Sequence, residues 1–126
     1  GAIHCVVTRS GAYVASVGAG RAVAGTENPD GSIIFCDEIS NPHLLDSSAF
    51  EMLKTNSSLK CTRFLGDVAL KQTNSTFSCL PDVVRLRHSS SRRFIVLASP
   101  QAWARGPRLP LEWAVAAYRS GGNPAN

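Results

Sequence analysis

The chain of 126 residues has the length of one domain, so residues 1–126 are expected to form a single folded unit with a core. Its 44% apolar and 17% charged residues argue against a disordered chain, and no apolar run approaches about 20 residues, so no membrane contact is predicted. Thirteen Lys and Arg against nine Asp and Glu give a net charge of +4, which predicts a basic surface that is either simply solvated or meets an acidic partner.

The first third of the chain reads as four β-strands joined by turns. Apolar, β-rich runs at 2–8, 12–18, 21–25 and 32–37 are separated by turns that contain glycine or proline. The first two runs are expected to pair as a hairpin, and the whole segment is expected to form an antiparallel meander.

Two helices are predicted in the rest of the chain. The first begins at Asn41-Pro42, where asparagine can cap the helix and proline fits its first position. It is expected to end at Thr55-Asn56 and to present one apolar face, made of Leu45, Ala49, Met52 and Leu53. The second begins at Pro110, has apolar residues at i, i+3, i+4 and i+7, and ends at Gly121-Gly122.

Two more strands lie between these helices, after a polar, loop-like stretch at 56–80. Residues 82–88 alternate between two faces with a period of two, which predicts a half-buried strand. The unbroken apolar run within 93–98 predicts a strand covered on both faces. Because only a short serine turn at 89–91 separates them, the two are expected to pair as a second hairpin.

The cysteines are Cys5, Cys36, Cys61 and Cys79, which stand far apart without a Cys-x-x-Cys pair. No histidine stands at a spacing from them that would suit zinc. We therefore expect four reduced, non-catalytic thiols, as in intracellular proteins. This indicates the cytoplasm or the matrix of an organelle such as the mitochondrion.

Local motifs for catalysis are weak when each is taken alone. Gly18-Ala19-Gly20-Arg21 lacks the third glycine and the following helix of a dinucleotide loop, so it reads as a β-turn. Ser99 lacks the flanking glycines of a nucleophile elbow. Asp67 is a single acid in a loop, where such a residue usually bonds its own backbone.

Four short motifs nevertheless follow one another along the chain: "GAGR" at 18–21, "RFLGDVALK" at 63–71, Pro81-Asp82 before a strand, and "ASPQAWA" at 98–104. Their order resembles that of the type-2C (PPM) metal-dependent serine/threonine protein phosphatases. In that family the hairpin ends Gly-Asp-Ser-Arg, the loop reads Arg-x-Leu-Gly-Asp-x-x-x-Lys, and the later strand ends Ala-Ser-Asp-Gly-x-Trp-Asp. The family-motif residues that the chain keeps are Gly18, Arg21, Arg63, Gly66, Asp67, Lys71, Ser99 and Trp103.

The chain departs from the family pattern where the family carries charge. Ala19 replaces the aspartate of the hairpin motif, and Pro100-Gln101 replaces the Asp-Gly pair. The family's Asp-Gly-His-Gly-Gly motif and its closing strand with Asp-Asn have no counterpart in these residues. Family members bind two Mn²⁺ or Mg²⁺ ions through aspartates, and such ions require anionic oxygen. The resemblance therefore implies no catalytic residue, no metal ligand and no cofactor.

The resemblance implies an α+β fold, a reduced version of the phosphatase-2C-like α/β/β/α sandwich, with two antiparallel sheets and flanking helices. The complete family fold is much longer, so strands would be missing and sheet edges would be left open, and partners usually cover such edges. We therefore expect a catalytically inactive domain, a pseudophosphatase, that acts as a scaffold or interaction subunit of a larger intracellular complex.

Two other functions are compatible with the sequence. One is a basic RNA-contacting subunit of an organellar ribosome or of its assembly machinery. The other is an active metal-dependent Ser/Thr phosphatase completed by residues outside this sequence. The residues expected to contact a protein partner or RNA are the arginines of the second half, Arg85, Arg87, Arg92, Arg93, Arg105 and Arg108.

Overall fold

The computed structural model describes residues 1–30, 32–45, 60–90 and 92–121, apart from the side chains of residues 27, 33–36, 92 and 93. In this part of the chain the strands are β1 (Ala2–Thr8), β2 (Gly11–Val17), β3 (Arg21–Glu27), β4 (Ile33–Glu38), β5 (Asp82–Arg87) and β6 (Arg92–Ala98). The helices are α2 (Val68–Thr73), the short 3₁₀-helix η1 (Pro100–Trp103) and α3 (Arg108–Arg119).

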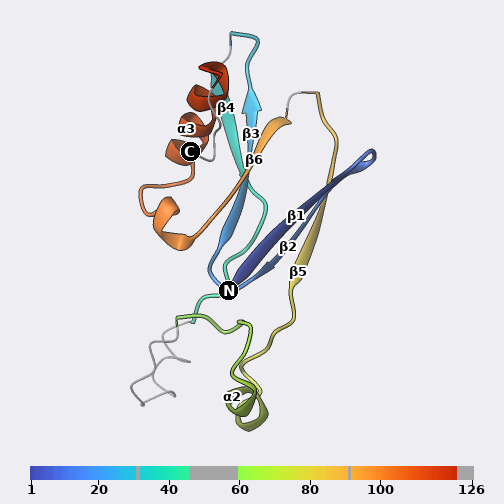
Figure 1. The fold of residues 1–126 in the computed structure, drawn as a ribbon, viewed down its shortest axis with the longest axis vertical. Helices are drawn as coiled ribbons and strands as arrows, with labels where there is room; N and C mark the ends of the chain where they lie inside the picture. The colour runs from blue at the N-terminus through green and yellow to red at the C-terminus, as the bar shows by residue number, and fades with distance from the viewer. Residues whose placement is uncertain (31, 46–59, 91, 122–126) are drawn as a thin grey trace.

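The described strands form two three-stranded antiparallel sheets. Sheet A has the order β1-β2-β5, and sheet B has the order β4-β3-β6 (Figure 1). The expected pair of antiparallel sheets is therefore confirmed. The lobe that carries α2 extends beyond one end of the sheets in Figure 1.

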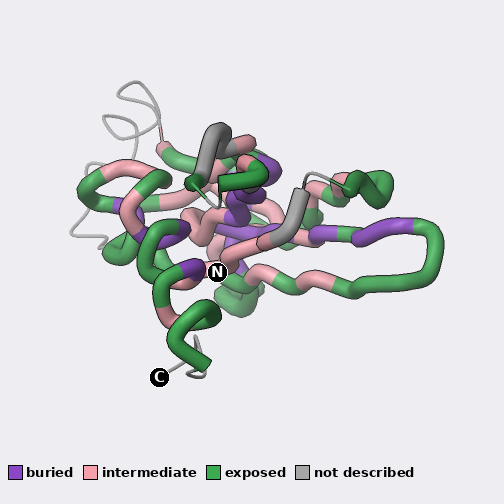
Figure 2. Tube along the Cα trace, turned by 90° about the horizontal axis from the view of Figure 1, so that it is seen from above, coloured by how far each residue is buried: buried purple, intermediate pink, exposed green. Residues whose placement is uncertain are grey.

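The main core lies between the two sheets. Its buried members are Val14 of β2, Ala22 and Ala24 of β3, and Ile39, which follows β4. Partly buried side chains from the flanking strands complete it: Ile3, Cys5, Val84, Leu86, Ile95 and Leu97. Figure 2 shows buried residues in the middle of the molecule and along one strand of the arm at the right, and exposed ones on the outer turns and much of the helix surface. The alternation along β5, with Val84 and Leu86 facing inward, agrees with the period of two in the sequence.

A second core covers the outer face of sheet B. Val23 of β3, Trp103 of η1 and Leu111 of α3 form this cluster, and Phe94 and Val96 pack against it. Gly25 lets α3 approach closely, because a Cβ at this position would lie 3.1 Å from a methyl group of Leu111. One flanking helix of the expected sandwich is therefore α3, which lies on sheet B.

Two of the expected strand pairings are wrong. The first third of the chain is not a single meander, because the chain passes from sheet A to sheet B between β2 and β3. For the same reason β5 and β6 do not form a hairpin: β5 pairs with β2, and β6 pairs with β3. A period of two shows which side chains share a face, but it does not show which strand lies alongside.

The helix boundaries also differ from the predicted ones. Residues 42–45 are not helical, and Leu44 forms a β-bridge with Cys61, so the helix expected from Pro42 does not begin there. The remainder of that predicted helix, from residue 46, lies outside the described residues. Helix α3 begins two residues before Pro110, with Pro107 at the N-cap, so Pro110 occupies the first turn. Among the described helices, none has the length and apolar character needed to cross a bilayer.

Truncation of Leu111 tests the outer core. Leu111 is fully buried, so Leu111→Ala should lower the free energy of unfolding by about 2–5 kcal/mol through lost contacts and a residual cavity. Trp113→Ala on the same helix is the control, because Trp113 is 61% exposed and its loss should cost less than about 1 kcal/mol. Urea unfolding followed by far-UV circular dichroism measures both. Equal effects of the two substitutions would contradict the assignment of α3 as a packed layer.

Candidate functional site

A pocket of about 760 Å³ lies between the end of β6 and the turn that joins β2 to β3. Ala98, Ser99, Pro100 and Gln101 line it from the end of β6. The facing wall includes side chains and backbone from the start of β1, from the β2–β3 turn and from the bridge region: Ala2, Ile3, Ala19, Gly20, Leu44, Lys60, Cys61 and Phe64. The pocket therefore lies where two motif segments, "GAGR" and "ASPQAWA", meet in space.

The described polar side chains of this pocket are neutral or cationic. Ser99 offers a hydroxyl, Gln101 an amide, Cys61 a thiol and Lys60 an ammonium group. None of the described residues lining the pocket carries a carboxylate. Such a set of groups can donate hydrogen bonds to an anion, but it offers little attraction for a hard cation.

The family's two divalent ions do not fit the described residues of this pocket. The described part of the chain contains no cluster of three or more His, Cys, Asp or Glu side chains. At the end of β6, Pro100 begins η1 and Ser99 is its N-cap, so the proline ring takes part in a helical turn and donates no ligand. A two-metal site holds its ions about 3.5–4 Å apart and needs several anionic oxygens around them.

Trp103 fixes the turn that follows β6. Its side chain is 5% exposed, and its indole Nε1–H donates to the carbonyl of Ala98 at 3.1 Å. This bond folds η1 back onto the last residue of β6. Trp103 is thus a packing residue of the outer core, as well as a family-motif residue.

The "RFLGD" loop is held by its own contacts. Asp67 has a left-handed backbone with φ 49°, and its carboxylate accepts from the backbone N–H of Leu70 at 3.2 Å, which caps α2. Lys71 donates to the carbonyl of Gly66 and lies 4.5 Å from the centre of the Phe64 ring. Asp67, Gly66 and Lys71 therefore stabilise the local turn, and Asp67 does not line the pocket.

A polar latch, formed by His43, Asp82 and Arg63, joins three distant segments. Arg63 donates to one carboxylate oxygen of Asp82 at 2.7 Å, and the Nε2–H of His43 donates to the other at 2.9 Å. The backbone N–H of Gly18 donates to Nδ1 of His43 at 3.1 Å, which requires this nitrogen to be unprotonated. The His43 ring therefore ties the β2–β3 turn to the start of β5.

Only part of this latch can be predicted from the sequence. Arg63 is a family-motif residue and Asp82 belongs to the Pro-acid motif, but no sequence motif assigns a role to His43. Its side chain is 7% exposed, although the residue lies outside the helices and strands, in a segment predicted to be helical. The only signal in the sequence that could have revealed it is a histidine directly after the Asn-Pro dipeptide.

The hydrogen bonds of the latch shift the titration of Asp82. The bond from His43, followed by the bond from Arg63, lowers the pKa of the Asp82 carboxyl below its ordinary value of 3.8. The carboxylate is 42% exposed, so solvent screens these interactions and weakens their effect on stability.

The remaining family-motif residues hold the backbone at the strand ends. Gly18 has φ 97°, which favours glycine, and a Cβ there would lie 2.9 Å from the Cα of Gly1. Arg21 donates to Glu38 at 3.3 Å across the neighbouring strands β3 and β4. These contacts are structural, and none brings a charged oxygen into the pocket.

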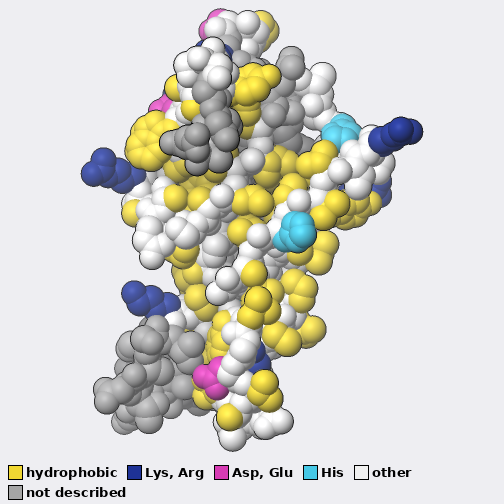
Figure 3. Space-filling view, in the orientation of Figure 1, with side chains coloured by type: hydrophobic (Ala, Val, Ile, Leu, Met, Phe, Trp, Pro, Cys, Tyr) yellow, Lys and Arg dark blue, Asp and Glu magenta, His cyan; other side chains and the backbone are white. Residues whose placement is uncertain are grey.

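The arginines expected to contact a partner are divided between layers. Arg85 and Arg87 lie on the exposed face of β5 in sheet A, and Arg85 lies 5.8 Å from the centre of the Tyr13 ring. Arg105 and Arg108 lie beside η1 and α3, on the far side of sheet B, and Arg108 pairs with Glu112. The side chains of Arg92 and Arg93 lie outside the described residues. On the face seen in Figure 3, Lys and Arg side chains stand apart at the margins of an apolar surface.

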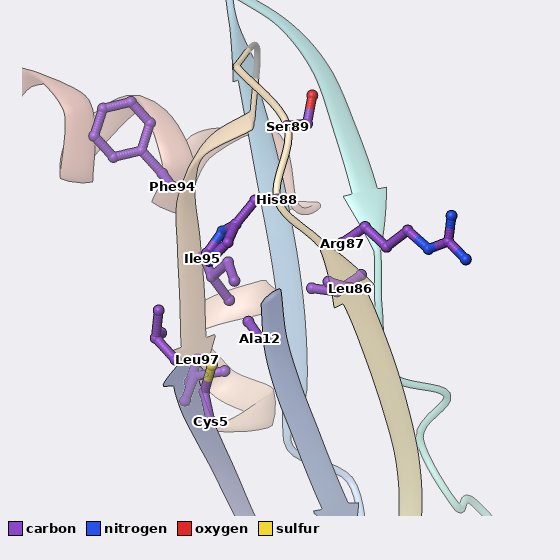
Figure 4. Close-up of a pocket in the computed structure, with 10 residues that line it drawn as sticks. Cys5, Ala12, Leu86, Arg87, His88, Ser89, Phe94, Ile95 and Leu97 are labelled. Carbon is purple, nitrogen blue, oxygen red and sulfur yellow. The ribbon is translucent and has the colours of Figure 1, made fainter. Parts of the chain in front are cut away.

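A second pocket, of about 430 Å³, opens between the sheets near the β1–β2 hairpin (Figure 4). Apolar side chains dominate its lining, chiefly Cys5, Leu86, Phe94, Ile95 and Leu97. His88 is bonded through Nε2–H to the carbonyl of Thr8 at 2.6 Å, and Arg87 points away from the pocket in Figure 4. The pocket offers apolar contact without a convergent set of catalytic groups.

The fold and the motif positions together define a phosphatase-like sandwich. The family model of protein phosphatase 2C matches residues 1–104, and the chain therefore belongs to the protein phosphatase 2C family. No curated protein matches the chain.

Solved structures show the same fold. The chain is similar to the crystal structure of serine-threonine phosphatase 2C from Toxoplasma gondii, with a TM-score of 0.76 and 21% sequence identity. The match covers 97% of this chain and 48% of that chain, so the present sequence spans about half the length of the solved phosphatase.

The latch predicts how stability responds to acid. Because its folded pKa is lowered, the ionised Asp82 adds stability that is fully present above pH 3.8 and is lost as the pH falls through the folded value. Asp82→Asn should therefore be less stable at neutral pH and should lose less stability on acidification. Urea unfolding at a series of pH values measures the difference. Val83→Ala, an exposed neighbour without a titrating group, should keep the wild-type profile, and a parallel profile for Asp82→Asn would contradict the latch.

Proposed function

We propose that this protein phosphatase 2C family chain is a catalytically inactive domain that serves as a scaffold or interaction subunit of an intracellular complex. The observation that carries the proposal is the makeup of the 760 Å³ pocket, which among its described residues has Lys60, Ser99 and Gln101 but no carboxylate. In the family, bound metal ions supply an activated water for attack on phosphorus. With these side chains, the pocket would repel such ions through Lys60 and bind them only through neutral oxygens.

The retained residues support the same proposal. Asp67, Lys71 and Trp103 make contacts that stabilise turns and layers, so a chain that only has to fold would keep them. Ala19 and Pro100 occupy positions where the family carries acids. The residues that stabilise the fold are kept and the acids are replaced, which favours a domain that uses the family's fold for a purpose other than metal chemistry.

The sheet edges indicate how partners could bind. In the described part of the chain, each sheet has only three strands, so β1 and β5 are the edges of sheet A, and β4 and β6 are those of sheet B. Unpaired backbone N–H and C=O groups on such edges are templates for another strand. A protein that adds a strand to one of these edges would therefore suit the scaffold function.

An RNA-contacting function is the second candidate. Arg85 and Arg87 favour it, because both are exposed on one face of an edge strand where a phosphate backbone could run. The competing hypothesis of an active phosphatase requires that acids from outside this sequence enter the pocket and overcome the charge of Lys60.

Assay of the purified chain with Mn²⁺ or Mg²⁺ and a phosphorylated peptide tests the main proposal. No metal-dependent turnover and no saturable binding of Mn²⁺ in calorimetry are expected, since the described lining of the pocket offers no anionic ligands. An active phosphatase of the same family, measured alongside, serves as the positive control. Turnover that co-elutes with the chain in size-exclusion chromatography and is removed by a chelator would contradict the proposal.

The RNA alternative predicts a steep salt dependence of binding. For single-stranded RNA, combined replacement of Arg85, Arg87, Arg92 and Arg93 by Ala should reduce the slope of log K against log salt by up to about three. The double variant Arg105→Ala/Arg108→Ala is the control, because these residues lie in another layer of the fold. Fluorescence anisotropy at several salt concentrations measures the slopes, and binding that is absent or insensitive to salt would remove this alternative.

A further inference from the structure

The segment between β5 and β6 carries the passage from sheet A to sheet B. It begins at His88, after Arg87 ends β5, and it contains three consecutive serines at 89–91. Ser89 and Ser90 are both exposed, and the backbone bends at Ser90. Serine hydroxyls on a surface bend are accessible to an enzyme that modifies them.

The residues before Ser90 follow a charge pattern. Arg87 lies three residues before Ser90 and Arg85 lies five before it, giving Arg-x-Arg-x-x-Ser. Ser90 is the only serine or threonine in the whole sequence with an arginine at the third position before it. Ser89 and Ser91 do not fit the pattern, because Arg85 and Arg87 lie an even number of residues before each of them. The pattern therefore distinguishes one hydroxyl among three neighbours.

The fold exposes the two arginines of this pattern on one face of a strand. Residues 85–87 lie on β5, whose neighbour in sheet A is β2, and no described strand pairs with its other edge. Arg85 and Arg87 share the exposed face of β5, since residues two apart in an extended chain point the same way. Leu86, between them, faces the core and holds the segment in place. An extended segment with two arginines on one side can be read by carboxylates on a facing surface.

We propose that Ser90 is a phosphorylation site for a serine/threonine kinase whose substrate groove carries acidic side chains for arginines at the third and fifth preceding positions. In the reaction, the Ser90 Oγ forms a bond to the γ-phosphorus of ATP, and the bond from that phosphorus to the β–γ bridging oxygen breaks. ADP leaves, and the serine proton passes to the base of the kinase. The inference is independent of the proposed scaffold function and of the catalytic state of the domain.

The modification would change the charge of this end of the molecule. A phosphoserine carries about −1.5 to −2 charges at pH 7, so it would offset roughly half of the chain's net charge of +4. The phosphate would be attached next to Ser89 and two residues from His88, both of which line the 430 Å³ pocket between the sheets (Figure 4). It would therefore weaken any contact that the arginines of β5 make with an acidic surface.

Phosphorylation of the intact chain by a purified kinase selective for Arg-x-Arg-x-x-Ser tests the proposal. With Mg²⁺ and labelled ATP, close to one phosphoryl group per chain is expected, and peptide mapping should place it on Ser90. Ser90→Ala should abolish incorporation, and Ser89→Ala, the matched control, should retain it. Arg87→Ala should lower kcat/KM by about tenfold or more, because a charge-assisted pair is lost.

A synthetic peptide of residues 83–93 separates the motif from its setting in the fold. If the kinase modifies the peptide but not the folded chain, the surface does not present Ser90 and the proposal is wrong. Equal labelling of the wild-type chain and Ser90→Ala, or failure to label both peptide and chain, would overturn it as well. Circular dichroism of each variant confirms that the fold is unchanged.

Discussion

The whole architecture depends on β3 being covered on both faces. Ala22 and Ala24 face sheet A, while Val23 packs against α3 and η1 and Gly25 lies under Leu111. The small side chains set the distance between three layers, because larger ones would push the sheets or the helix apart. The strand is also tied to the segment after β4, since the buried Ser40 hydroxyl accepts from the N–H of Ala22 at 2.7 Å.

The two ends of this sandwich differ in their electrostatics. At the end where the family motifs meet, acidic charge lies in the latch, where Arg63 and His43 compensate Asp82. The pocket beside it carries Lys60 and neutral polar groups among its described residues. The charged groups of the latch therefore hold separate segments together. Because these contacts do not involve the pocket, the backbone can keep the family's fold although the described pocket residues lack anionic oxygen.

Two of the chain's arginines lie together on one strand, although the basic residues as a whole are spread over several layers. Arg85 and Arg87 stand on an open edge of sheet A, where charge discourages unwanted pairing with other strands. The same arginines precede an exposed serine bend, so a single phosphoryl group, with about −1.5 to −2 charges, could offset most of the charge of Arg85 and Arg87. The two arginines of this strand can thus hinder pairing with other strands and also attract an acidic partner, which phosphorylation of the bend would weaken. Leu86 and Arg87 also line the apolar pocket between the sheets.

Much of the fold follows from the sequence alone, and the reasons are local. The apolar runs located the six described strands to within a few residues, and the alternation in β5 assigned its inner and outer faces. The capping role of Asp67 could be anticipated, since a lone aspartate in a turn usually bonds its own backbone. The order of the short motifs identified the family, because motif order survives even where single residues are replaced.

Only the tertiary structure decided which strands are neighbours. It placed β2 and β3 in different sheets, separated β5 from β6, and brought His43 to Asp82 across 39 positions of sequence. It also divided the basic residues between layers, which no count of charges can show. Local patterns fix the direction in which each side chain points, whereas pairing depends on long-range packing around β3 that no short stretch of sequence contains.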